Sequence, residues 1–311
     1  MSTFNFEPAP FVPFKDKAVI ERCRNIKRED ITRHSNPDFK IQVVKDEDLT
    51  FLWFGDILSR IKLASESGEK FIMIVPNPWP GYRHVARMIN QMRIDCRNFW
   101  GFAMDEYADQ DGNIAPEGWE WGFGHAMLKF FYYEIDKDLR PPREQFVLFS
   151  DLKDINDYSK KLADLGGADI CYSGPGWTGH LAFLEPDAPE LQAPLEEWKT
   201  FGAKVVTLSP FTIGQNSLHG CFGNSGDLTA VPPKAATIGP ADVIGAKHRF
   251  DTHGITVGGS LNSWQRLITR LVLHGPVTPL LPASILQTLR TDVYVSEKSA
   301  MNIENNWDIG Y

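Results

Sequence analysis

Short apolar runs alternate with segments of helical periodicity along this chain, and that alternation limits the folds it can adopt. The run 71–75 is apolar at every position, which is typical of a strand covered on both faces. Segments of helical spacing stand on either side of it, at 49–67 and 81–92. The pattern predicts an α/β fold with a doubly wound, mostly parallel sheet and helices on both faces.

The same rhythm continues toward the C-terminus. Residues 1–45 are interpreted as an N-terminal extension with a short helix at 16–28, because prolines interrupt its first part. Residues 46–311 are interpreted as a single α/β domain. Further strands are expected at 98–104, 146–149, 168–172, 203–208, 254–258, 270–273 and 292–295. Further helices are expected at 119–134, 154–165, 261–269 and 283–289.

The composition narrows the functional classes. A net charge of -8 disfavours nucleic acid as the main partner, because phosphate binding needs a basic face. No apolar run approaches the roughly 18 residues of a membrane span, and the four cysteines show no metal or redox spacing. We therefore expect a cytoplasmic protein with no membrane partner. Phosphate-loop, dinucleotide and zinc-protease motifs are absent from the sequence, so no metal or organic cofactor is expected.

Three loops follow predicted strands, at 76–81, 105–112 and 174–186. In a parallel sheet, ligands bind outside the carboxyl ends of the strands. The third loop is the most informative, because its glycines allow close approach of the backbone to a ligand. Its His180 and Glu185 suggest acid–base chemistry.

Each of these polar residues also has a structural interpretation. Of the adjacent carboxylates Asp105 and Glu106, only one can face a site, where partial burial would raise its pKa and suit it to proton abstraction. An acidic loop that caps the next element is the alternative. His180 could equally be a loop histidine held by a backbone carbonyl, and Glu185 could orient the imidazole or cap a helix.

Aromatic residues are interpreted in two ways. Trp177, inside the glycine-rich loop, could stack on a sugar ring at the mouth of a pocket or simply pack there. The aromatic side chains of the helix expected at 119–134 are interpreted as core rather than as a sugar-stacking surface.

Two segments in register carry a family resemblance. The segment 102–107, FAMDEY, resembles the MDEY segment of the glucosamine-6-phosphate deaminase/isomerase family, and 176–186, GWTGHLAFLEP, resembles that family's G-x-D-G-H-I-A-F-N-E-P loop. The segments around Thr207 and Asn216, and the run 255–258, look like further family segments. The superfamily also includes the 6-phosphogluconolactonases, but Tyr107 and the LAFLEP run favour the deaminase side.

The resemblance implies a mechanism and a set of site residues. Family members open an amino-sugar ring, move a proton between C2 and C1, and release ammonia. Asp105 would be the base, His180 would assist ring opening, and Glu185 would complete the relay. A small-molecule sugar is the implied partner, and a homo-oligomer is left open. The substrate-binding residues implied are Glu106, Asn77, Gly174, Gly176, Trp177, Thr178 and Gly179.

Departures from the family pattern bear on the substrate. Thr178 stands where the resemblance leads one to expect an aspartate beside the histidine. The first loop, 76–81, contains three prolines, which donate no amide hydrogen bond to a phosphate. Ile213 and Val277 stand near positions where the family has an arginine and a lysine. We therefore expect an isomerase or deaminase whose substrate is not the standard glucosamine 6-phosphate. A non-catalytic sugar-binding or sensor protein and a sugar-lactone hydrolase are the alternatives.

Overall fold

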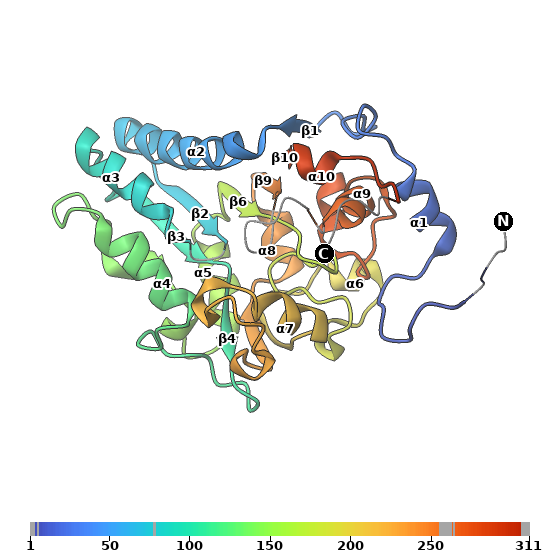
Figure 1. The fold of residues 1–311 in the computed structure, drawn as a ribbon. Helices are drawn as coiled ribbons and strands as arrows, with labels where there is room; N and C mark the ends of the chain where they lie inside the picture. The colour runs from blue at the N-terminus through green and yellow to red at the C-terminus, as the bar shows by residue number, and fades with distance from the viewer. Residues whose placement is uncertain (1–3, 5, 77–78, 255–262, 264, 306–311) are drawn as a thin grey trace.

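The computed structural model describes residues 4, 6–76, 79–254, 263 and 265–305, and it has at its centre a seven-stranded parallel sheet (Figure 1). The strand order is β1-β10-β9-β6-β2-β3-β5, and each pairing is parallel. The predicted α/β fold is therefore confirmed. The strands are β1 (Phe39–Val44), β2 (Phe71–Val75), β3 (Phe99–Ala103), β5 (Phe146–Val147), β6 (Ile170–Ser173), β9 (His248–His253) and β10 (Thr291–Ser296).

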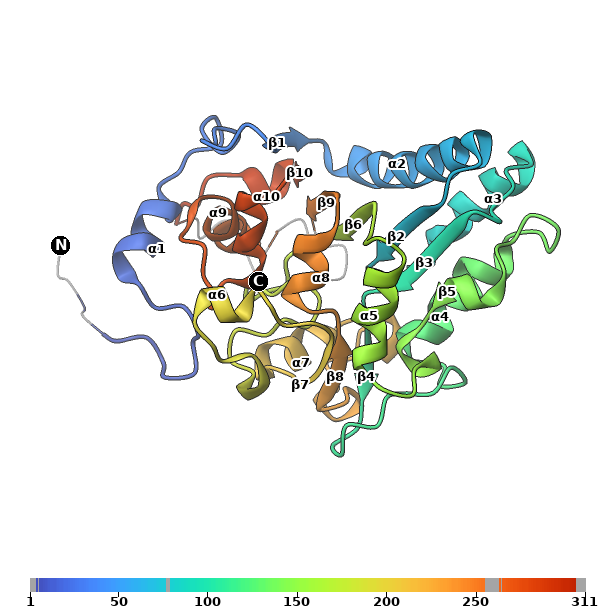
Figure 2. The same ribbon diagram turned by 180° about the vertical axis from the view of Figure 1, so that it is seen from behind.

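Alternate residues of β2 face two separate hydrophobic cores, which explains its unbroken apolar run. Phe71, Met73 and Val75 pack in the core that includes α2, α3 and α4. Ile72 and Ile74 pack in the core on the other face, to which α5, α8 and α9 contribute. Figure 2 shows α5 and α8 from that second face. The helices are α1 (Lys17–Arg24), α2 (Asp46–Ser67), α3 (Tyr82–Met92), α4 (Phe123–Phe130), α5 (Asn156–Asp164), α6 (Leu195–Trp198), α7 (Pro210–Asn216), α8 (Pro240–Gly245), α9 (Arg266–His274) and α10 (Glu297–Ala300).

A second, antiparallel sheet of three strands stands beside the first, in the order β4-β8-β7. It consists of β4 (Asp105–Ala108), β8 (Lys234–Thr237) and β7 (Lys204–Thr207). Only Met104 separates the end of β3 from the start of β4. The N–H of Met104 donates to Val75 in the large sheet, and its carbonyl accepts from Ile238, just after β8. The chain thus passes directly from one sheet to the other at Asp105.

Several expected elements differ in the structure. The apolar run 270–273, expected as a strand, lies inside α9, because a short apolar run does not distinguish a buried helix from a buried strand. The helix expected at 119–134 is shorter and forms α4, and that expected at 283–289 is the 3-10 helix Pro282–Thr288. Most of 254–258, and part of 261–269, lie outside the described residues.

Residues 39–44 of the segment interpreted as an N-terminal extension form β1, which pairs with β10 from Phe39↔Thr291 to Val44↔Ser296. The short helix expected at 16–28 is α1, and it packs beside α9 (Figure 2). None of the helices in the described ranges combines the length and the apolarity that a membrane crossing requires.

Candidate active site

A cavity of about 840 Å³ opens where four central strands end. Pro76, Met104, Gly174 and Gly254 line it, and each directly follows one of β2, β3, β6 and β9. This is the edge of the sheet where a parallel α/β fold binds ligands. Side chains of α2, of the segment before α4 and of the segment after α7 complete the wall.

Asp105 lies on this wall, and the structure buries it from both sheets. Its side chain is 4% exposed, and its backbone is paired with Thr237 of β8. Burial, and then the charge of Glu106, raises the pKa of Asp105 well above its usual value. A carboxylate with a raised pKa that faces a cavity can accept a proton from a bound molecule.

Glu106 points the other way and is occupied by a helix. Its carboxylate accepts hydrogen bonds from the backbone N–H groups of Tyr107 (2.8 Å), Phe123 (3.0 Å) and Gly124 (2.6 Å). The last two are the first residues of α4, so Glu106 caps that helix. It is absent from the cavity wall. The geometry therefore assigns Glu106 to helix capping rather than to substrate binding, as the alternative interpretation of the acidic pair allowed.

His180 also lines the cavity, and its two ring nitrogens differ. Nδ1 lies 3.1 Å from Oγ1 of Thr178, 3.2 Å from Oγ1 of Thr212 and 3.4 Å from Oε2 of Glu185. No described residue hydrogen-bonds Nε2, which is therefore the nitrogen left for a ligand. Two hydroxyl groups thus occupy the side of the imidazole where the family resemblance leads one to expect a carboxylate.

Glu185 lies behind His180 and outside the cavity wall. It is 1% exposed, and neither carboxylate oxygen has a hydrogen-bond partner among the described residues. A buried carboxylate without hydrogen bonds is costly unless a nearby positive charge compensates it. The 3.4 Å approach to Nδ1 of His180 supplies that charge whenever the imidazole is protonated. Glu185 thus lies beside Nδ1 of His180, and a relay between the two residues stays a prediction.

Two glycines of the loop are required by close packing. A Cβ added at Gly176 would lie 1.8 Å from Nε2 of His180, and one added at Gly174 would lie 2.7 Å from the carbonyl oxygen of Thr252. The N–H of Gly176 also donates to the carbonyl of His180 (2.9 Å). Gly176 therefore provides the space for the imidazole, and both glycines line the cavity.

The other expected binding residues are more scattered. Gly179 adopts φ +81°, which favours glycine, and stays off the cavity wall. Trp177 is 47% exposed and also lies off that wall. Its backbone N–H donates to the side-chain oxygen of Gln215, and its ring lies near that of Phe211. Thr178 is absent from the cavity wall, and its hydroxyl group lies 3.1 Å from Nδ1 of His180. Asn77 lies outside the described residues.

A second histidine of the cavity was not predicted from the sequence. His219, three residues after α7, lines the same cavity. Burial, and then the charge of His180, lowers the pKa of His219 to about 4. It is therefore neutral near pH 7 and can donate or accept one hydrogen bond there.

A buried polar network below the cavity was also not predicted. The hydroxyl of Ser173 donates to Asp251 (2.6 Å), and Nε2 of His253 lies 2.8 Å from the other oxygen of that carboxylate. Nδ1 of His253 lies 3.0 Å from the hydroxyl of Thr269. Asp251 and His253 are fully buried, whereas Ser173 reaches the cavity wall. This network explains how β9, with the polar sequence HRFDTH, forms an interior strand.

The cavity has an acidic wall without lysine or arginine. All 32 lysines and arginines of the chain lie among the described residues, and none lines the cavity. Its ionisable wall residues are Asp46, Asp105, Glu120, His180, His219 and Cys221. Such a wall does not compensate the charge of a phosphate dianion. Among the described residues, no group of three or more His, Cys, Asp or Glu is placed to hold a metal ion.

The start of α3, which follows the first loop, offers few free backbone N–H groups to a phosphate. The first three amides of α3 are engaged: Tyr82 donates to Trp79 (3.0 Å), Arg83 to Pro80 (3.3 Å) and His84 to Gly81 (2.9 Å). The guanidinium of Arg83 stacks 4.4 Å from the centre of the Phe130 ring and stays off the cavity wall.

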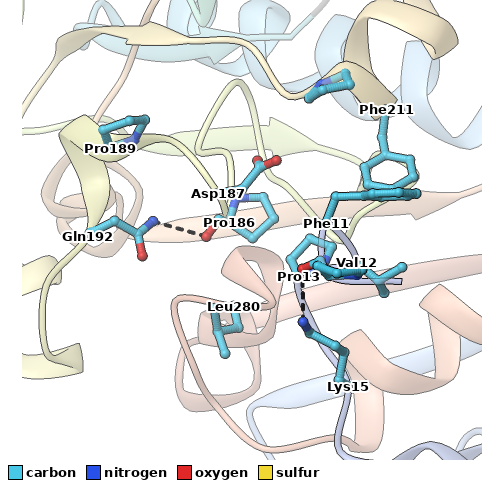
Figure 3. A pocket seen from close by; sticks show the side chains of 12 residues that line it. Phe11, Val12, Pro13, Lys15, Pro186, Asp187, Pro189, Gln192, Phe211 and Leu280 are labelled. Carbon is cyan, nitrogen blue, oxygen red and sulfur yellow. Dashed lines mark hydrogen bonds between the residues drawn. The ribbon is translucent and has the colours of Figure 1, made fainter. Parts of the chain in front are cut away.

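A second cavity, of about 850 Å³, lies between the N-terminal segment and residues 186–192 (Figure 3). The Phe11 and Phe211 rings meet there at 5.9 Å, and Nζ of Lys15 donates to the carbonyl of Pro10. Among the described residues that line it, Lys15 and Asp187 are the only ionisable ones. No ion pair joins these two described residues and no histidine lines this cavity, so the first cavity is the candidate active site.

Comparisons with known proteins show which proteins the chain resembles. No protein-family model matches the chain. Glucosamine-6-phosphate deaminase of Caenorhabditis elegans is 24% identical over 251 residues, covering 78% of this chain and 84% of that protein. The Porphyromonas gingivalis enzyme of the same name is 25% identical, covering 84% of this chain and 92% of that protein.

Solved structures share the fold. A monomeric glucosamine-6-phosphate deaminase, described as a missing link of the NagB superfamily, superposes with a TM-score of 0.66 at 20% identity, covering 84% of this chain and 98% of that one. The 6-phosphogluconolactonase of Leishmania guyanensis superposes with a TM-score of 0.58 at 13% identity, covering 85% and 98%. The chain is therefore similar in sequence to glucosamine-6-phosphate deaminases, at about 25% identity over most of its length, and it shares its fold with a deaminase and a 6-phosphogluconolactonase of known structure.

Proposed function

We propose that the protein is a sugar isomerase or deaminase that transfers a proton between neighbouring carbons of an open-chain sugar lacking a phosphate group. The observation that carries this proposal is a single cavity whose wall holds Asp105 and His180 but no lysine or arginine. The acid–base pair supports the reaction, and the acidic wall supports the choice of substrate.

The proton transfer follows from the two side chains. His180, through Nε2, exchanges a proton with the ring oxygen and so opens the sugar ring. The Asp105 carboxylate then takes the proton from C2 while the imidazolium of His180 donates one to O1 of the aldehyde, which leaves an enediol or an enolamine. Return of that proton to C1 completes an aldose–ketose isomerisation. When C2 carries an amine, addition of water to the resulting C2 imine releases ammonia and leaves the ketose.

His219 contributes a neutral hydrogen-bonding group, rather than a charge, to the proposed reaction. His219 is neutral near pH 7, so it can donate a hydrogen bond to a developing oxyanion without competing with Asp105 for the proton. Glu185 stabilises the protonated form of His180 from behind. Together these groups hold the proton within the cavity.

Incubation in heavy water tests the proposal. Free and phosphorylated amino, keto and aldo sugars would be followed by NMR for C2–H exchange and isomerisation, with ammonia measured in parallel. We expect exchange with unphosphorylated sugars, reduced by about 100-fold or more in Asp105→Asn. No exchange with any sugar, together with ligand binding that survives Asp105→Asn, would instead support a non-catalytic sugar-binding protein.

A further inference from the structure

Exposed aromatic rings stand on the wall of the active-site cavity. Trp79 is 38% exposed and Trp121 is 46% exposed, and both line the cavity. The helix around 119–134 was expected to place its aromatic residues in the core, yet Trp121 is on the surface of the cavity. Two partly exposed indoles on the wall of one cavity indicate contact with a ligand.

Both indoles are held in position by other aromatic rings. The Trp79 ring packs against Phe54 at 5.2 Å and Trp53 at 5.9 Å. The Trp121 ring packs against Phe222 at 5.9 Å and Trp119 at 6.0 Å. Each indole therefore presents a supported surface to the cavity, with little side-chain freedom left to lose when a ligand binds.

The size and charge of the cavity restrict what these surfaces bind. A volume of about 840 Å³ lies in the range of cavities that enclose drug-sized molecules, and a single sugar ring fills only part of it. The nearby carboxylates of Asp46 and Glu120 accept hydrogen bonds from hydroxyl groups or from an ammonium group, but they repel anions. A sugar ring satisfies both conditions, because its C–H face stacks on an indole while its hydroxyl groups point to the rim.

We propose that Trp79 and Trp121 form a subsite for a second sugar ring, so that the substrate class is a reducing disaccharide without anionic groups. The reducing-end residue lies at Asp105 and His180, and the second ring stacks on the indoles. This inference rests on the proposed proton-transfer function, because only a reducing end can open at His180. The inference adds to that function the class of sugar that the cavity selects.

The kinetic test compares D-glucosamine with its β-1,4-linked disaccharide on the full-length protein. We expect kcat/KM for the disaccharide to be at least tenfold higher. Trp79→Ala and Trp121→Ala should lower it by roughly 10- to 100-fold for the disaccharide and by much less for the monosaccharide. Phe51→Ala is the matched control, since Phe51 is an exposed aromatic residue of α2 that does not line the cavity.

A binding measurement separates this inference from the proposed function. Cys221 lines the cavity and is the one exposed cysteine of the chain's four, so its rate of alkylation reports occupancy without turnover. Protection by the disaccharide that is lost in the two tryptophan variants supports the subsite even if no sugar reacts. The subsite proposal is overturned if both sugars protect Cys221 equally, or if the variants lose protection by both sugars equally. Binding of an N-acyl monosaccharide as strong as that of the disaccharide also overturns it. The same holds if the disaccharide does not bind.

Discussion

Asp105 is a buried carboxylate whose charged form serves the proposed reaction but lowers the stability of the folded protein. Its pKa is raised because burial penalises the charged form, and Glu106 adds to the effect. Its folded-state pKa therefore lies above its unfolded-state pKa. The folded protein gains relative stability below the unfolded pKa and loses it as the pH rises through the folded pKa. The charged carboxylate that the proposed reaction needs is thus held at a cost to the stability of the fold.

Asp105→Asn should raise Tm at pH 8 by a few degrees and change it much less at pH 4, because the amide carries no charge in the cavity. Differential scanning calorimetry at the two pH values measures this. The same variant should have lost its proton exchange. A lower Tm at pH 8 would contradict a desolvated carboxylate at this position.

Gly176→Ala tests the packing of the imidazole. The new Cβ would stand 1.8 Å from Nε2 of His180, so the ring or the loop must move. We expect a loss of activity of about 100-fold or more and a destabilisation of about 1–3 kcal/mol. Gly214→Ala in α7 is the control, because no atom lies within 4 Å of its added Cβ. If Gly176→Ala kept wild-type activity, the assignment of Nε2 to the ligand would be wrong.

The start of α4 is the element that most clearly separates structure from catalysis. Glu106 accepts hydrogen bonds from two backbone N–H groups there and from a third in β4. Gly122 and Gly124 leave space for its carboxylate, with added Cβ atoms only 3.1–3.4 Å from its oxygens. Helix capping by Glu106 and the proton transfer proposed for Asp105 are thus divided between two adjacent carboxylates, one on each side of β4.

Glu106→Ala should destabilise the fold by about 1–3 kcal/mol, because buried amides at the start of α4 lose their acceptor. Urea unfolding measures the loss. The KM of a reacting sugar should stay within about twofold, since Glu106 is absent from the cavity wall. A large rise in KM at unchanged stability would restore a substrate-binding role.

At the scale of the whole molecule, the charge of the cavity predicts its response to anions. Phosphate or sulfate at about 10 mM should neither inhibit sugar exchange nor protect Cys221 from alkylation, because no lysine or arginine lines the cavity. Sodium chloride at matched ionic strength is the control. Specific protection by phosphate would show that an anion site exists in or beside the cavity.

The extent of prediction from sequence can be traced to particular residues. Asp105 and His180 were expected because each stands in a local segment that follows an apolar strand. Glu106 was expected among the substrate-binding residues but caps α4, since the direction of each adjacent side chain depends on β4 crossing into a second sheet. His219 and Asp251 reach the site through contacts distant in sequence, and β9 has no apolar pattern to reveal it. The fold was predictable from local pattern, whereas the cavity wall depended on long-range packing.

The passage from β3 to β4 through Met104 has a mechanical consequence. Asp105 begins the small sheet, while the loop of His180 leaves the large sheet and is tied to the small one, since the N–H of Phe183 donates to Thr237 of β8. Asp105 and the imidazole of His180 are therefore both connected to the two sheets. A hinge between the sheets would pull them apart, so any closure over a sugar must come from the rim, where α2 and the segment before α4 face the cavity.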